Sequence, residues 1–144
     1  MKKKNLKKVE GGEKAHKETI GPSENIIKKW LGRKHNPARF LHGGNGYPDW
    51  IVIDGKKKVH FYEIKPANGT ISKMVPSEKQ KKVFKEVISK FKTHISILYY
   101  FKNKYNKFHY KEYKINSSED LRKLLKMKNP REIRKELKNP NFKQ

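Results

Sequence analysis

The chain contains no cysteine, few acidic residues and no long apolar run, and each absence excludes a class of protein. Without cysteine it has neither disulfides nor thiolate metal sites, which fits an intracellular protein. No segment approaches the roughly 20 consecutive apolar residues of a membrane-spanning helix, and the first residues lack the apolar stretch of a secretion signal. We therefore expect a cytoplasmic or nucleoid-associated protein with no membrane partner.

Positive charge is what the chain has in excess. Its 144 residues include 37 Lys and Arg against 14 Asp and Glu, a formal net charge of +23. Such a charge attracts polyanions, of which nucleic acid is the commonest inside cells. An anionic membrane surface is an alternative, but it requires a broad apolar helix face that is not obvious here; lysine could also serve solubility alone. Because few of the basic residues are arginine, we expect recognition of nucleic-acid backbone and shape rather than base sequence.

The apolar residues are gathered into a few stretches, which predicts one α/β domain. Residues 1–16 are rich in lysine and nearly free of apolar side chains, so we expect a disordered basic arm. Residues 17–116 make the predicted core domain. Residues 117–144 make a basic helical C-terminal extension that could add to nucleic-acid binding.

The predicted elements alternate between helices and strands. A helix follows the N-cap Ser23 and ends at Gly32, and Ser77-x-x-Gln80 opens a second helix with a capping-box pattern. Further helices follow Ser117 and Pro130. The predicted strands are 38–42, 49–54, 59–65, 95–101 and 107–115. A right-handed crossover should make 59–65 and 95–101 parallel neighbours, with 107–115 nearer an edge.

Two acids and a lysine converge at one end of this predicted sheet. Side chains alternate along a strand, so Glu63 and Lys65 share one face. A hairpin turning at Asp54-Gly55 returns Asp49 to the level of Glu63 or Lys65. Two carboxylates with water can hold Mg²⁺ or Mn²⁺, and a neighbouring lysine can orient the attacking water or neutralise phosphate charge. Each residue alone is ordinary, but the set indicates metal-dependent phosphodiester hydrolysis.

These residues also resemble a known signature. Gly46-Tyr47-Pro48-Asp49, thirteen residues and then Glu63-Ile64-Lys65-Pro66 are similar to the signature of the PD-(D/E)xK nuclease superfamily, especially archaeal Holliday-junction resolvases and virus-type replication-repair (VRR-NUC) nucleases. Ser77-Glu78-Lys79-Gln80 resembles the start of the helix that follows in these families. The resemblance spans about residues 23–101. It implies a restriction-endonuclease-like core, a central mixed β-sheet flanked by helices.

The resemblance further implies a Mg²⁺- or Mn²⁺-dependent endonuclease that cuts DNA as a homodimer. The expected substrate is a Holliday junction or other branched DNA in recombination, repair or replication, although a restriction-like or flap-type activity would use the same residues. Asp49 and Glu63 would bind the metal, with the backbone carbonyl of Ile64 as a further ligand. Lys65 would assist the attacking water.

Two more residues match the resemblance with weaker support. Glu24 would correspond to a metal-binding glutamate of the first helix, and it shares a helix face with Ile27 and Leu31. It could instead be an acid favoured by the helix dipole. Gln80 lies in line with Phe84 and could reach the active site, or it could only complete the capping box.

We also expect DNA contacts around the glycine-rich loop before Asp49. The predicted contact residues are Arg39, His42, Gly43, Gly44, Asn45, Lys73 and Lys79. The glycines could instead serve a tight turn into Asp49, and they lack the Gly-Lys-Ser/Thr of a phosphate-binding P-loop. A second hypothesis is a non-catalytic basic nucleic-acid-binding module on a nuclease-like fold. The intact set of Asp49, Glu63 and Lys65 favours the enzyme.

Overall fold

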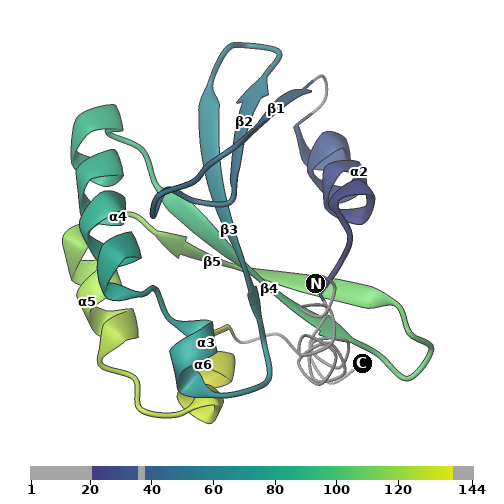
Figure 1. Cartoon of the computed structure of the whole chain (residues 1–144), viewed down its shortest axis with the longest axis vertical. Coiled ribbons are helices and arrows are strands. Elements are labelled where there is room, and N and C mark those ends of the chain that lie inside the picture. The colour runs from purple at the N-terminus through teal and green to yellow at the C-terminus, as the bar shows by residue number, and fades with distance from the viewer. Residues whose placement is uncertain (1–20, 36–37, 138–144) are drawn as a thin grey trace, which may run out of the picture.

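Five strands form one mixed sheet whose spatial order follows the chain (Figure 1). The computed structural model describes residues 21–35 and 38–137, so the predicted basic arm at residues 1–16 lies outside the described residues. The strands are β1 (Ala38–His42), β2 (Trp50–Asp54), β3 (Val59–Pro66), β4 (Ile95–Lys102) and β5 (Phe108–Ile115). The described chain is therefore an α/β domain built on a mixed sheet, as predicted.

The strand register determines which residues lie opposite one another across the sheet. β3 and β4 are parallel, while the pairs β1–β2, β2–β3 and β4–β5 are antiparallel. The predicted parallel pair and the edge position of β5 are both confirmed. In the β2–β3 hairpin Trp50 pairs with Tyr62. Asp49, the residue before β2, consequently lies level with Glu63.

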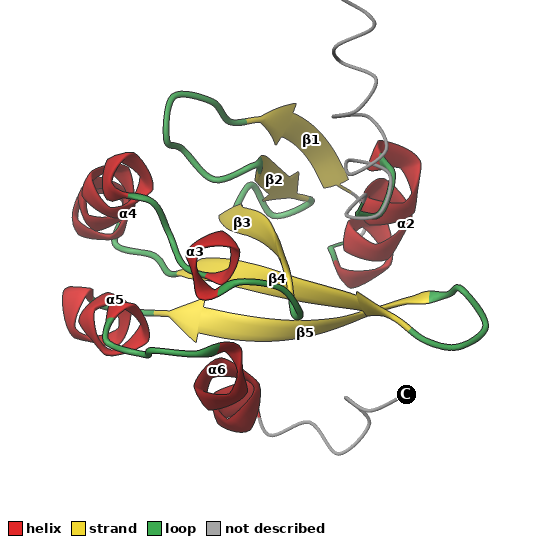
Figure 2. Cartoon of the chain, turned by 60° about the horizontal axis from the view of Figure 1, so that its bottom comes forward, coloured by secondary structure: helices red, strands yellow, loops and turns green. Residues whose placement is uncertain are grey.

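Helices cover both faces of the sheet. They are α2 (Glu24–Lys34), α3 (Ile71–Met74), α4 (Glu78–Phe91), α5 (Ser118–Leu125) and α6 (Pro130–Leu137). Figures 1 and 2 show α2 across the sheet from α4 and α5. None of these helices in the described part of the chain is long and apolar enough to cross a membrane.

The two faces of β3 point into two different apolar cores. Phe61 belongs to the larger core, between the sheet and α3 to α6. Tyr62 belongs to the smaller core beneath α2, together with Leu98 and Trp50. This alternation confirms the predicted faces. Glu63 lies on the same face as Phe61 and is thereby directed towards α4.

Two element boundaries differ from the prediction. α2 runs past Gly32 to Lys34, because a glycine inside a helix costs only about 1 kcal/mol and the backbone N–H of the C-cap His35 still reaches the Leu31 carbonyl at 2.8 Å. The segment between β3 and α4, for which the sequence predicted no helix or strand, contains the short helix α3. Its Met74 is fully buried in the larger core, so packing rather than helix propensity explains this turn.

The last two helices belong to the larger core. Leu121 and Leu124 from α5 and Ile133 and Leu137 from α6 are buried in the same cluster as the strand residues of β3 and β4. The segment predicted as a C-terminal extension therefore packs on the sheet as far as Leu137.

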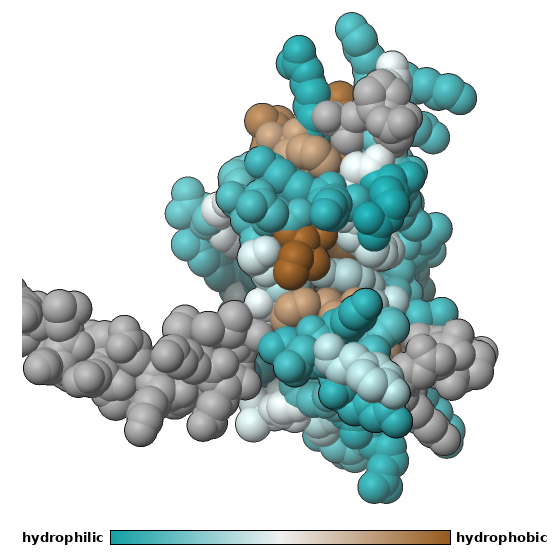
Figure 3. All heavy atoms as spheres, turned by 90° about the vertical axis from the view of Figure 1, so that its right-hand side faces the viewer, coloured by the Kyte–Doolittle hydropathy of each residue, from teal (hydrophilic) through white to brown (hydrophobic). Residues whose placement is uncertain are grey.

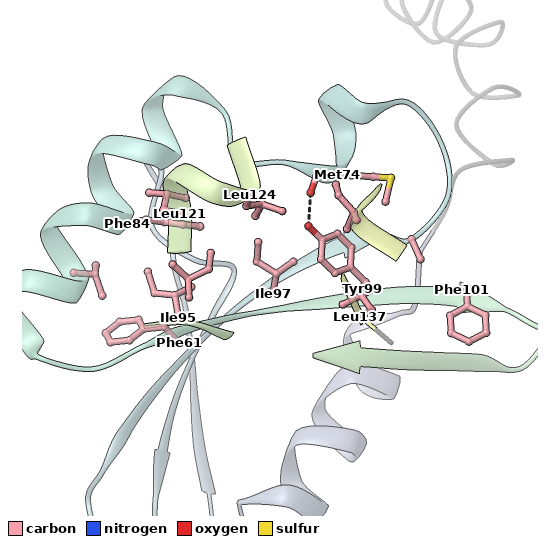
Figure 4. Packing of buried hydrophobic residues seen from close by; sticks show 14 residues of the cluster. Phe61, Met74, Phe84, Ile95, Ile97, Tyr99, Phe101, Leu121, Leu124 and Leu137 are labelled. Carbon is pink, nitrogen blue, oxygen red and sulfur yellow. Dashed lines mark hydrogen bonds between the residues drawn. The ribbon is translucent and has the colours of Figure 1, made fainter. Parts of the chain in front are cut away.

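Tyr99 provides a test of this packing. Its side chain is fully buried on β4, and its hydroxyl donates a 2.6 Å hydrogen bond to the backbone carbonyl of Met74 (Figure 4). Tyr99→Phe should lower the free energy of unfolding in urea by about 1–2 kcal/mol, because a buried carbonyl loses its donor. The matched change Tyr105→Phe, at a side chain that is 69% exposed, should have almost no effect. Equal effects of the two changes would contradict this role of the hydrogen bond.

Candidate active site

The glycine-rich loop between β1 and β2 fixes the position of Asp49. The Gly43 N–H donates to the Asp49 carbonyl at 3.1 Å, and a Cβ on Gly43 would lie 1.8 Å from the Pro48 carbonyl oxygen. Only glycine fits there. Gly46 has φ +91° and lies against Val83 of α4, so the loop also approaches that helix. These contacts favour the tight-turn interpretation of Gly43 and Gly46.

Reciprocal hydrogen bonds hold the two acids side by side. The Asp49 N–H donates to Oε1 of Glu63 at 3.1 Å, and the Ile64 N–H donates to Oδ2 of Asp49 at 2.9 Å. Glu63 is only 3% exposed, whereas Asp49 keeps an open side towards solvent. The pair thus has one buried carboxylate and one that an external molecule can reach.

Lys65 and Gln80 complete a polar cluster around Glu63. The Lys65 ammonium, on a residue that is 8% exposed, lies 3.6 Å from Oε2 of Glu63 and donates to Oε1 of Gln80 at 3.2 Å. The Gln80 amide donates to Oε2 of Glu63 at 2.7 Å. The loop before β2, strand β3 and helix α4 therefore each contribute to one site.

Gln80 performs both of the roles that the sequence left open. Its Oε1 also accepts the Ser77 N–H at 3.0 Å, and its own N–H donates to Oγ of Ser77 at 3.2 Å, which completes the capping box. One side chain consequently ties the start of α4 to Glu63 and Lys65. Ser77 was predicted only as a cap, and its indirect link to the acids was missed.

Both acids are reluctant to ionise, Glu63 because of burial and the charge of Asp49, and Asp49 because of desolvation. Burial, followed by the charge of Asp49, raises the pKa of Glu63 to about 7, against the opposing effects of Lys65 and Gln80. Loss of surrounding water likewise raises the pKa of Asp49, although the Ile64 N–H and Lys65 oppose it. A cation between two such carboxylates would relieve this repulsion. The donor set therefore fits a hard divalent ion such as Mg²⁺.

The raised pKa of Glu63 predicts how the metal-free protein responds to pH. The folded state binds the proton more tightly than the unfolded state, where the carboxyl has a pKa near 4.5. This contribution to stability is complete below about pH 4.5 and is lost as the pH rises through about 7. In EDTA, the free energy of unfolding of the wild type minus that of Glu63→Gln should therefore fall between pH 5 and pH 8 in urea titrations. A constant or rising difference would contradict the pKa shift.

Glu24 lies at the surface, at the start of α2. Its side chain is 57% exposed, and its Oε2 is 2.7 Å from Nε2 of His42 on β1, whose ring packs on Trp50. Within the described part of the chain, Glu24 pairs with His42 and makes no hydrogen bond or ion pair with Asp49 or Glu63. Its role as a metal ligand thus stays a prediction, as does that of the Ile64 carbonyl.

The predicted DNA-contact residues divide into two groups. Gly43, Gly44 and Asn45 lie in the loop that leads into Asp49, and Lys79 is exposed beside Gln80 in the first turn of α4. His42 ends β1 next to the same loop. The other two residues lie on other elements: Arg39 is exposed on β1 opposite Ile53, towards the far end of β2, and Lys73 is exposed on α3.

No protein-family model, no curated protein and no solved structure matches this chain. The class of site is therefore defined by its own geometry. It consists of two adjacent carboxylates, a buried ammonium group and a side-chain amide, gathered at the point where the β2–β3 hairpin meets the start of α4.

Proposed function

We propose that the protein is a metal-dependent endonuclease that hydrolyses phosphodiester bonds in DNA on a restriction-endonuclease-like core. One observation carries the proposal: the Asp49 N–H bonds the Glu63 carboxylate, the Ile64 N–H bonds the Asp49 carboxylate, and the Lys65 ammonium lies 3.6 Å from Glu63. A pair of surface acids on an ordinary hairpin would have no need of this burial or of these partners.

The metal would be held by the acids. Asp49 and Glu63 offer carboxylate oxygens, the ligands that Mg²⁺ and Mn²⁺ prefer, and the Ile64 carbonyl is proposed as a further ligand. When bound, the ion would lower the pKa of a coordinated water and offset the charge that builds on the phosphate.

The chain's own groups position the reactants. Lys65 is proposed to donate a hydrogen bond to the attacking water or to a phosphate oxygen, because its ammonium group is the cation nearest to Glu63 in the site. Gln80 holds both Lys65 and Glu63 through its two amide atoms, so neither side chain is free to turn away. This amide makes Gln80 a positioning residue.

The surface supports DNA as the substrate. The net charge is +23, and in Figure 3 hydrophilic side chains cover most of the face that is not drawn in grey, with apolar side chains in small separate patches. Lysines bind phosphate as point charges without reading bases. We therefore propose selection of branched or otherwise structured DNA, such as a Holliday junction, in recombination, repair or replication. A homodimer would present two active sites to two strands.

A cleavage assay tests the proposal. Purified protein is incubated with a four-way junction, a flap and a plain duplex in Mg²⁺, Mn²⁺ or EDTA, at several salt concentrations. The expected result is cutting that requires a divalent metal and is fastest on branched DNA. Tight binding of all three DNAs without cutting in either metal would contradict the enzyme and leave a non-catalytic binding module.

A further inference from the structure

A second cluster of metal-ligating side chains lies at the other end of β2. Asp49 precedes this strand and Asp54 ends it, so the two carboxylates are separated by about 17 Å of strand at about 3.3 Å per residue. Around Asp54 the fold gathers His60 from β3 and His35 from the end of α2. One potential ligand atom from each of these three residues lies within 4.8 Å of the other two.

The turn of the hairpin holds Asp54 in place. Its Oδ1 accepts the backbone N–H groups of Lys56 and Lys58 at 2.8 and 2.9 Å, and its Oδ2 lies 2.9 Å from Nε2 of His60. One carboxylate oxygen is thus fixed by the backbone, while the other is directed at an imidazole.

Packing also orients the two imidazoles. The rings of His35 and His60 are stacked, with their centroids 4.0 Å apart, and Nε2 of His35 is hydrogen-bonded to the Tyr62 hydroxyl. Tyr62 is buried in the core beneath α2, so its hydroxyl is a fixed partner. The Tyr62 hydroxyl leaves Nδ1 of His35 as the nitrogen available to an ion, and a hydrogen bond of this kind orients a metal-ligating histidine.

The cluster is partly open to solvent. The side chains of His60 and Asp54 are each 18% exposed, and His35 is also partly exposed. A small hydrated ion can therefore reach the cluster from the surface.

We propose that His35, Asp54 and His60 bind one divalent transition-metal ion of the Zn²⁺ or Co²⁺ class. Two imidazole nitrogens and one carboxylate oxygen suit such ions better than Mg²⁺, which prefers an all-oxygen set. Neighbouring ligands around tetrahedral Zn²⁺ lie about 3.3 Å apart. The three ligand atoms must therefore move closer together, and one imidazole must turn out of the stack so that a nitrogen of each ring points at the ion. A water can take the fourth position.

The ion would act as a structural cross-link. His35 is the C-cap of α2, whereas Asp54 and His60 belong to the β2–β3 hairpin. One ion would join the end of that helix to the hairpin, and binding to the folded state alone would stabilise the protein by mass action. This inference does not depend on nuclease activity.

Titration with Co²⁺ tests the site. In the full-length chain carrying Asp49→Asn and Glu63→Gln, which removes the competing acids, visible absorption should report one bound Co²⁺ per chain. Zn²⁺ should displace it, whereas about a hundredfold excess of Mg²⁺ should not. Adding His35→Gln or His60→Gln should weaken binding at least about 10-fold. The control His109→Gln, at a histidine paired with Asn103, should leave it unchanged.

A second measurement keeps both histidines in place, so it does not depend on whether the histidine variants fold. In the chain that carries only Asp49→Asn and Glu63→Gln, ¹H–¹⁵N spectra of the six histidine side chains should show the signals of the His35 and His60 rings shifting on addition of one equivalent of Zn²⁺. The other four rings should stay in place. No stoichiometric binding, or binding that leaves His35 and His60 unshifted and is unaffected by their substitution, would overturn the proposal.

Discussion

Replacing Glu63 by glutamine should lower the rate of DNA cleavage on the order of 10³-fold in saturating Mg²⁺, with DNA affinity almost unchanged. The substitution keeps the size of a side chain that is 3% exposed and removes the charge that would hold the ion. Loss of one preorganised electrostatic group commonly costs about 10²–10³-fold, and loss of the metal adds to this. Single-turnover cleavage and a binding titration on the same junction measure the two quantities.

The control for this change is Glu86→Gln on α4. Glu86 is exposed and pairs with Lys90, so its substitution should leave cleavage within about twofold of the wild type. Asp49→Asn should behave like Glu63→Gln, because the two acids share the proposed ion. If Glu63→Gln kept most of the activity, Glu63 would have no part in binding the metal.

Replacing Lys65 by methionine should lower the cleavage rate at saturating DNA by about 10²–10³-fold. The methionine keeps the apolar stem in its buried position but removes the ammonium group that contacts Glu63 and Gln80. Because Lys65 is only 8% exposed, it adds little to long-range attraction of DNA. The loss should therefore fall on the chemical step and spare the dissociation constant.

Lys79→Met is the matched comparison. Lys79 is exposed in the first turn of α4, one residue from Gln80. Its substitution should weaken DNA binding and make the slope of log binding constant against log salt concentration shallower by about one. The cleavage rate at saturating DNA should stay near that of the wild type. A Lys65→Met protein that lost affinity in the same way, and kept its rate, would show that Lys65 is only another phosphate contact.

The sequence predicted the sheet and the relation of the acids because both follow from short-range rules. Alternation along β3 separates Glu63 from Tyr62, and the turn after Asp54 brings Asp49 level with Glu63. The capping pattern Ser77-x-x-Gln80 also located the start of α4 correctly. The sequence left open whether the Gln80 side chain reaches the active site, since this depends on how α4 docks against β3.

The other differences between the sequence-based prediction and the structure arise from tertiary contacts. A helical wheel placed Glu24 with Ile27 and Leu31, but it gives no information on how far α2 extends over the sheet, and the Glu24 side chain lies at the surface with His42. α3 forms because the core has space for Met74.

The cluster of His35, Asp54 and His60 was likewise not identified from the sequence. With the helix predicted to end at Gly32, the position of His35 was undefined. Its proximity to His60 follows from the extension of α2 to Lys34 and from the packing of that helix over β3.

Crystals of the wild-type protein grown with Mn²⁺ test the central claim, that Asp49 and Glu63 share a divalent ion, most directly. The anomalous difference map should contain a peak bonded to carboxylate oxygens of both residues, and that peak should be missing in Glu63→Gln crystals grown in the same way. A wild-type map with no ion between these two side chains, from protein that cleaves DNA in the same buffer, would contradict the account.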